Sequence, residues 1–171
     1  MIIREAQSQD LDELAHLAEN IFEQEYKKYS IEMRKDYFLS IINGRFNGFY
    51  ISEIDKNITG FAIYIPIVLV GTAELLQMGV RKDLQGQGIG TRLLRESMDK
   101  YIEKLKSNKL DLYALYLTTS EDNPVGQRLY EKCGFERKGR LEDTFIGIGN
   151  VEIIMTKILD RTKVYPKNTL W

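Results

Sequence analysis

The chain has 171 residues, of which 43% are hydrophobic and 29% charged, and its formal net charge is -1. This length suits one domain with a substantial core, and the near-neutral charge excludes the basic surface that is typical of nucleic-acid-binding proteins. The single cysteine, Cys133, excludes an internal disulfide and a multi-cysteine zinc site.

A single cysteine also fits a reducing compartment, so we expect a cytoplasmic protein. The longest apolar run, residues 61–70, contains Pro66 and is shorter than the roughly 20 residues that span a bilayer. The N-terminus lacks the charged and apolar segments of a signal peptide. We therefore expect neither export nor membrane insertion.

The chain begins with a predicted strand and two predicted helices. Residues 1–5 can form a strand, and Ser8 or Asp10 can cap a helix whose apolar residues recur at helical spacing. His16, the only histidine, is expected at the boundary or surface of this helix, so no histidine-based triad is predicted. Ser30 can cap a second helix, which Gly44 would end as a C-cap.

A β-hairpin follows. Residues 49–54 and 58–70 are expected to be strands, because the residues between them, Asp55-Lys56-Asn57, have turn chemistry. Pro66 cannot donate to a ladder and predicts an edge position or a bulge. Residues 74–80 are the next predicted strand, residues 91–105 its helix and residues 112–118 a further strand.

The last helix has clear boundaries. Asn123-Pro124 predicts its start and Gly134 its C-cap. Residues 135–141 and 151–158 form a final pair of strands, joined through Gly147 and Gly149. We place one domain at residues 1–159 and a tail at residues 160–171. The element order predicts an α/β (α+β) fold in which helices flank a mixed, mostly antiparallel central sheet.

Three glycines, Gly86, Gly88 and Gly90, separate the strand at residues 74–80 from its helix. Unpaired N–H groups and the positive dipole end make a helix N-terminus an anion cradle. The Walker phosphate loop is excluded because Thr91 stands where its lysine belongs, and G-x-G-x-x-G is excluded because Thr91 also replaces the last glycine. The remaining pattern is Gln85-x-x-Gly-x-Gly.

This pattern and a second motif, one strand later, resemble those of the GNAT superfamily of acyl-CoA-dependent N-acetyltransferases. The second motif has Asn123, then Tyr130 seven residues on, then Gly134-Phe135. The motifs cover residues 74–135, and the element order extends the similarity to about residue 158. The resemblance implies direct acetyl transfer from acetyl-CoA to a primary amine of a small molecule, polyamine or peptide, without a metal or an enzyme nucleophile.

The resemblance also implies which residues hold acetyl-CoA. Loop amides would hold its pyrophosphate, and the preceding strand would pair with its pantetheine arm. The implied residues are Met78, Val80, Gln85, Gly86, Gln87, Gly88, Ile89, Gly90, Thr91, Asn123 and Gly126. Alternatives stay open: the loop could be an ordinary glycine-rich turn, and Asn123 could serve only as an N-cap. Gly126 departs from the alanine that is common in the family.

Two catalytic residues are implied as well. Tyr130 would be the general acid that protonates the CoA thiolate, since a phenol with a pKa of about 10 stays protonated beside a thiol with one of about 8.5. Glu74 would be the general base for the amine, directly or through water, and an amide near Met78 would stabilise the oxyanion. Tyr130 could instead only pack on its helix, and Glu74 could be an ordinary strand-end carboxylate. Glu53 and Glu121 are weaker candidates.

The sequence does not identify the amine that accepts the acetyl group. Acidic residues near the first helix could attract a polyamine, but basic residues follow closely, so a solvated surface of mixed charge explains both sets. These residues are Asp12, Glu13, Glu19, Glu23 and Glu25, followed by Lys27, Lys28, Arg34 and Lys35. Aromatic residues could line a pocket or belong to the core, namely Tyr26, Tyr29, Tyr37 and Phe38. Residues 145–150 could form a lid or a simple turn.

Two functions of different classes remain. One is an acetyltransferase for a small-molecule or peptide amine, which Tyr130 and Glu74 favour. The alternative is a GNAT-like domain that binds acyl-CoA without turnover, as a sensor or structural partner. The apolar tail with Tyr165, Leu170 and Trp171 could dock on the body or on a second copy in a homodimer. No nucleic-acid or membrane partner is expected.

Overall fold

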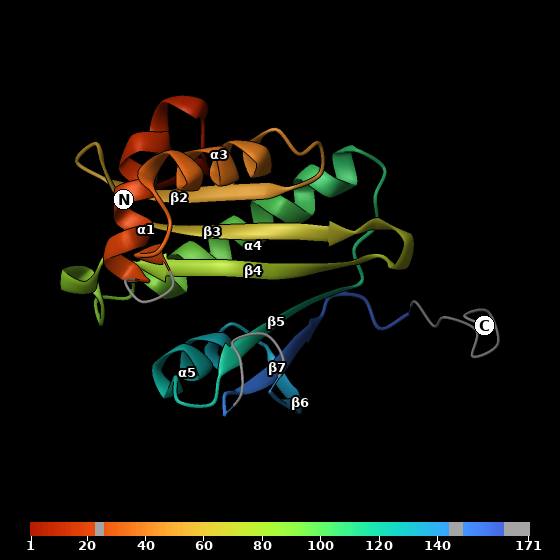
Figure 1. Cartoon of the computed structure of the whole chain (residues 1–171). Helices are drawn as coiled ribbons and strands as arrows, with labels where there is room; N and C mark the ends of the chain where they lie inside the picture. The colour runs from red at the N-terminus through yellow and green to blue at the C-terminus, as the bar shows by residue number, and fades with distance from the viewer. Residues whose placement is uncertain (23–25, 144–148, 163–171) are drawn as a thin grey trace.

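The computed structural model describes residues 1–22, 26–143 and 149–162 (Figure 1). The elements in chain order are β1 (Ile2–Glu5), α1 (Leu11–Ile21), α3 (Ile31–Ile42), β2 (Gly48–Ile54), β3 (Asn57–Ile67), β4 (Thr72–Val80), α4 (Ile89–Ser107), β5 (Ala114–Ser120), α5 (Pro124–Lys132), β6 (Glu136–Glu142) and β7 (Val151–Ile158). The predicted order of strands and helices is confirmed. Most of the lid candidate and of the tail lies outside the described residues.

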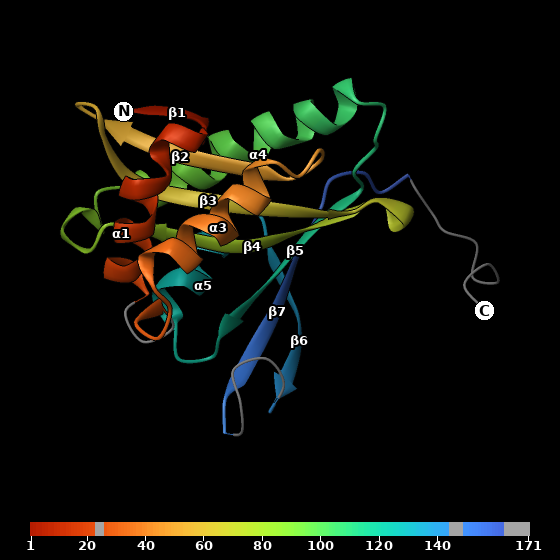
Figure 2. The ribbon, with the colours of Figure 1, turned by 45° about the horizontal axis from the view of Figure 1, so that its top comes forward.

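The strands form one seven-stranded sheet in the order β1-β2-β3-β4-β5-β7-β6. Every neighbouring pair is antiparallel except β4 with β5. This parallel pair is short, because it joins only residues 72–74 to residues 114–116. Beyond Glu74, β4 stays paired with β3 and β5 stays paired with β7, so the two strands diverge (Figure 2). The expected mixed, mostly antiparallel sheet is confirmed.

Two hydrophobic cores lie on opposite faces of the sheet. α4 buries its apolar stripe, including Leu93 and Tyr101, against one face. α1 and α3 cover β2, β3 and β4 on the other face, where Phe38 meets Phe49 and Phe61 (Figure 1). α5 packs its Leu129 and Tyr130 into the α4 core. The sheet thus separates an α4–α5 side from an α1–α3 side.

Pro66 lies in a strand that is interior to the sheet over most of its length, but β3 has a free edge at Pro66 itself. β3 runs between β2 and β4, yet its pairing with β2 ends at Tyr64. Pro66 therefore pairs only with Ala73 of β4 and faces no strand on its β2 side, where a missing N–H breaks no ladder bond. The ladder irregularity falls instead between Ile63 and Tyr64.

Local turn and cap signals have mixed outcomes. The hairpin turn is confirmed, since Asp55 and Lys56 both adopt positive φ, 48° and 66°. The Ser30 hydroxyl caps α3 by accepting from the Met33 amide at 3.2 Å, but α3 ends at Asn43 and not at a left-handed Gly44.

Neither Ser8 nor Asp10 caps α1 with its side chain. The Asp10 carboxylate instead accepts hydrogen bonds from Arg4 and from the Gln7 amide. Across the described parts of the chain, no helix has both the length and the apolar character needed to cross a membrane.

Candidate functional site

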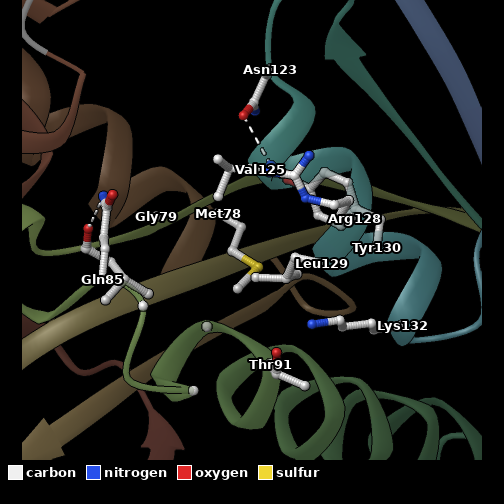
Figure 3. A pocket seen from close by; sticks show the side chains of 15 residues that line it. Met78, Gly79, Gln85, Thr91, Asn123, Val125, Arg128, Leu129, Tyr130 and Lys132 are labelled. Atoms are coloured by element: carbon white, nitrogen blue, oxygen red, sulfur yellow. Dashed lines mark hydrogen bonds between the residues drawn. The ribbon is translucent and has the colours of Figure 1, made fainter.

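A cavity of about 570 Å³ lies between the second half of β4, the loop that follows it and α5 (Figure 3). The predicted residues that line it are Met78, Val80, Gln85, Gly86, Gly88, Gly90, Thr91, Asn123, Gly126 and Tyr130. The motifs before and after β5, which are far apart in sequence, therefore share one cavity. Five further lining residues were not predicted, namely Gly79, Val125, Arg128, Leu129 and Lys132.

The edge of β4 that faces the cavity presents backbone groups that do not pair with β3. Arg81 donates its amide to Thr59 on β3, and hydrogen bonding to a neighbouring strand alternates along an antiparallel pair. By this alternation Val80 and Met78 turn their backbone groups away from β3, toward the space left by β5. A ligand with amide groups can therefore extend β4 at Met78.

The glycine loop presents free backbone donors to the cavity. Gly86 and Gly88 have φ of 77° and 82°, and a Cβ at either position would meet no atom within 4 Å. These glycines hold left-handed backbone beside open space. From residue 86 to residue 91, no backbone N–H donates to an acceptor within the described residues. Consecutive free N–H groups at the start of α4 suit an anion such as a pyrophosphate.

Three predicted loop residues use their side chains elsewhere. The Gln85 amide donates to the Val80 carbonyl at 3.0 Å, which closes the loop onto β4. Gln87 reaches the Asp83 carbonyl at 3.4 Å, and Ile89 is buried in the α4 core. Gln87 and Ile89 do not line the cavity, so only their backbone N–H groups are available to a ligand there.

Asn123 acts as the N-cap of α5. Its Oδ1 accepts from the Gly126 amide at 3.0 Å, and its Nδ2 donates to the Thr119 hydroxyl at 3.2 Å. The local explanation for Asn123 is therefore sufficient, although the residue also lines the cavity. A Cβ at Gly126 would lie 2.4 Å from the Asn123 Nδ2, so an alanine at this position would require the Asn123 side chain to shift.

Tyr130 lies in the cavity lining on α5. Its ring packs against Phe135 with 6.2 Å between centroids, and burial raises the pKa of Tyr130 to about 12. Within the residues that the structure describes, the Tyr130 hydroxyl forms no hydrogen bond. A protonated phenol without a protein partner is free to donate to a ligand atom in the cavity.

Glu74 lies outside the cavity, on the α1–α3 side of β4. It is half-buried, and the Tyr116 hydroxyl of β5 donates to its Oε2 at 3.1 Å. Burial and then the charge of Glu74 raise the pKa of Tyr116 to about 12 and also raise the pKa of Tyr37 on α3. Glu74 thus stands where β4 and β5 separate, beside two phenols and across the sheet from the cavity.

The two weaker candidates for the general base form ion pairs outside the cavity. Glu53 pairs with Arg4 at 2.9 Å, and Glu121 pairs with Arg140 at 3.0 Å. His16 is exposed on α1, as expected. Cys133 is buried, and burial raises the pKa of its thiol, which disfavours the reactive thiolate.

The acidic residues of α1 are paired with protein groups. Glu19 binds Arg34 at 2.8 Å, and Asp12 binds Lys35 at 2.6 Å. Glu13 accepts from the Ile58 amide at 2.6 Å, while Glu23 and Glu25 lie outside the described residues. These pairs fit the interpretation of a mixed-charge surface.

The aromatic residues of this region serve several roles. Phe38 is in the core, Tyr26 donates its hydroxyl to Gln77 at 2.6 Å, and Tyr29 and Tyr37 are partly exposed. In the described part of the chain, no group of three His, Cys, Asp or Glu side chains could hold a metal ion.

Comparisons with known proteins agree with this geometry. The model of the acetyltransferase (GNAT) family matches residues 11–135. Over 148 residues the chain is 26% identical to the spermidine N(1)-acetyltransferase of Vibrio cholerae, which covers 83% of this chain and 82% of the relative. It is 28% identical over 171 residues to an uncharacterized N-acetyltransferase of Methanocaldococcus jannaschii, and the match covers 100% of both chains.

A solved structure has a similar fold. The PaiA N-acetyltransferase of Thermoplasma acidophilum, in complex with coenzyme A, superposes with a TM-score of 0.69 at 24% identity. The match covers 92% of this chain and 98% of that structure.

Proposed function

Because this chain belongs to the acetyltransferase (GNAT) family and is an acyl-CoA-dependent N-acetyltransferase, we propose that its cavity holds acetyl-CoA and that Glu74 and Tyr130 serve acetyl transfer to a primary amine. The observation that carries this proposal is the divergence of β4 from β5. The cavity is lined by Met78, Gly79 and Val80 of β4, which lie beyond the last residues paired with β5, and Glu74 is the last paired residue of β4 and faces the α3 side. Two substrates can therefore meet there from opposite faces of the sheet, as direct transfer in a ternary complex requires.

The residues of the cavity fit an elongated anionic ligand. The free N–H groups of residues 86–91 would hold the pyrophosphate, with the dipole of α4 behind them. Met78 would pair with the amides of the pantetheine arm. Arg128 and Lys132 are one helical turn apart on α5 and have no ion-pair partner among the described residues, so they add positive charge to the cavity.

The bound thioester supplies an activated acetyl carbonyl, and the chain's own groups handle the protons. Glu74, directly or through water, would take a proton from the acceptor ammonium, because only a neutral amine has a lone pair. The Met78 amide would donate to the carbonyl oxygen as negative charge develops. Tyr130 would donate its proton to the departing sulfur as the C–N bond forms and the C–S bond breaks, and it would regain a proton as the new amide nitrogen releases the one it still carries.

The acceptor is an amine, and its identity is part of the proposal. The name of the Vibrio cholerae relative supports a polyamine. A small-molecule amine and a peptide amine are the other acceptors that we retain. We place the reaction in the cytoplasm, because the single buried cysteine suits a reducing compartment.

Binding of coenzyme A to the purified protein tests the site. At a hundred times its dissociation constant, CoA should raise the free energy of unfolding by roughly 2.7 kcal/mol, measured as a shift of the melting temperature. A Gly88→Asp variant should lose this shift, because a negative side chain would replace open space beside the loop amides. A wild-type protein that melts at the same temperature with and without CoA would refute the proposal.

A further inference from the structure

Glu152 on β7 is a buried acid that has no partner among the described residues. Its exposed fraction is 4%, although glutamate rarely lies inside a protein unpaired. Among residues 1–22, 26–143 and 149–162, none donates a hydrogen bond to its carboxylate or forms an ion pair with it. A buried carboxylate that no described group compensates calls for a cation, which a bound ligand can supply.

The Glu152 carboxylate can still be reached from solvent. Of the side-chain nitrogen and oxygen atoms in the described residues, Arg34 Nε is the one that is fully enclosed and lacks a partner. The unpaired Glu152 oxygens are therefore not fully enclosed, although most of the residue is covered. A ligand cation can reach such a group, whereas no cation among the described residues pairs with it.

Glu152 and Glu74 face the same side of the sheet. Their strand neighbours Ile153 and Leu75 point into the α4 core, and side chains alternate along a strand. Both carboxylates therefore point to the side opposite α4, where β5 and β7 extend beyond α1 and α3 (Figure 1). Tyr116 lies opposite Glu74 and Ser120 lies opposite Glu152, so one face of β5 connects the two acids.

The separation of the two acids follows from strand geometry. The register positions of Tyr116 and Ser120 are four residue steps apart on β5, or roughly 13 Å, and the two strand spacings across β5 add roughly 10 Å sideways. The Cα atoms of Glu74 and Glu152 are thus about 16 Å apart. A linear aliphatic chain with an amine near each end can span such a distance, whereas a simple monoamine cannot.

We infer that the acceptor is a linear di- or polyamine whose distal ammonium binds Glu152 while its reacting amine lies beside Glu74. This inference rests on the proposed amine acetylation and names its substrate class. The acids of α1 do not compete for this role, since Glu19 and Asp12 already pair with Arg34 and Lys35. The hydroxyl groups of Tyr116, Thr118 and Ser120 line the same face of β5 and can accept hydrogen bonds from protonated amines.

Initial rates of CoA thiol release with spermine, spermidine and n-butylamine test this assignment. The wild type should use spermine or spermidine at least tenfold better than n-butylamine, judged by kcat/KM, because a charge-assisted hydrogen bond is lost with the monoamine. Glu152→Gln keeps the shape and removes the charge. It should lower kcat/KM for the polyamine about tenfold or more, mainly through KM, and leave the rate with n-butylamine unchanged.

A matched control comes from the adjacent strand. Glu142 on β6 is exposed and already paired with Arg140, so Glu142→Gln should behave as the wild type. Calorimetric binding of spermine to the wild type and to folded Glu152→Gln, both loaded with CoA, reports on Glu152 without turnover. Weaker binding to the variant supports the assignment.

Two results would overturn the inference. One is equal spermine affinity for the wild type and Glu152→Gln. The other is a higher kcat/KM for peptide N-termini than for polyamines, found both in the wild type and in Glu152→Gln. Release of no thiol with any amine contradicts the proposed function instead, and spermine binding would then still report on Glu152.

Discussion

Glu74 of β4 and Tyr116 of β5 are the last residues that join the two strands before they diverge, and the Tyr116 hydroxyl donates to the Glu74 carboxylate at 3.1 Å. This contact positions the proposed base at the opening through which the substrates meet. Tyr116→Phe should lower kcat/KM for the amine about tenfold, because a hydrogen bond to a charged group is lost. The KM for acetyl-CoA should stay unchanged, and an unchanged amine kcat/KM would show that Glu74 needs no such support.

Glu74→Gln should reduce kcat by about 10²- to 10⁴-fold, the usual contribution of a general base. The defect should shrink as pH rises, because a larger share of the amine is then already neutral. The measurement is kcat/KM for the amine against pH. A variant whose pH–rate profile matches that of the wild type would assign proton removal to water or to another group.

Tyr130→Phe should also lower kcat by about 10²- to 10⁴-fold while binding of CoA persists, since the proton for the leaving sulfur is lost. Burial raises the pKa of Tyr130 to about 12, so the phenol stays protonated in the wild type throughout the usual assay range. The same change at the partly exposed Tyr29 serves as a control and should have no effect. Turnover of Tyr130→Phe at the wild-type rate would leave this tyrosine a packing role only.

Arg128→Gln and Lys132→Gln should each raise the KM for acetyl-CoA severalfold and leave kcat nearly unchanged. The physical reason is that each side chain lines the cavity and contributes a cation without a partner in the described residues. The wild-type KM should rise with ionic strength more steeply than that of the double variant, because salt screens these charges. The exposed Lys100 of α4 provides the control substitution. If Lys100→Gln raised the KM for acetyl-CoA as much, the effect would come from the net charge of the whole protein and not from the charges in the cavity.

The ion pair between Arg4 and Asp10 makes a prediction about stability and pH. Arg4 donates to the Asp10 oxygens at 2.7 Å and 2.9 Å, which holds the pKa of Asp10 below its ordinary value near 3.8. A lowered carboxylate pKa stabilises the fold above the unfolded-state pKa, and this contribution is lost as pH falls through the folded-state value. Asp10→Asn should therefore reduce the free energy of unfolding by about 1–3 kcal/mol at pH 7, less so below about pH 4.

Urea unfolding of the wild type and of Asp10→Asn at pH 7 and at pH 3 checks this prediction. Asp12→Asn removes an exposed carboxylate from the first turn of α1, two residues after Asp10, and should leave the midpoint unchanged. An Asp10→Asn midpoint that drops equally at pH 7 and pH 3 would trace the effect to lost packing and not to the ion pair.

The features that the sequence predicts well depend on few neighbouring residues. Left-handed glycines such as Gly88, the Asn123 cap and the turn at Asp55 are set by backbone preferences within a short segment. The glycine loop and Tyr130 could be assigned to one site because both belong to a family pattern. The cavity between β4 and α5 then brings them together in space.

The features that the sequence did not predict depend on contacts between distant segments. Tyr116 and Glu74 are 42 positions apart, so no local pattern links them. The missing donor of Pro66 predicts an edge or a bulge from one residue, whereas the early end of β2, which provides a local edge inside the sheet, depends on a distant segment. Arg128 and Lys132 carry a usable signal, since they recur one helical turn apart on the face of α5 that also carries Val125 and Leu129.

The central claim is direct transfer at the divergence of β4 and β5, with both substrates bound at once. Initial rates of CoA thiol release, measured over a grid of acetyl-CoA and spermidine concentrations, test it most directly. The account predicts double-reciprocal lines that intersect, as expected for a ternary complex. Parallel lines would indicate an acetylated enzyme intermediate and contradict the account, as would the absence of thiol release with every amine tested.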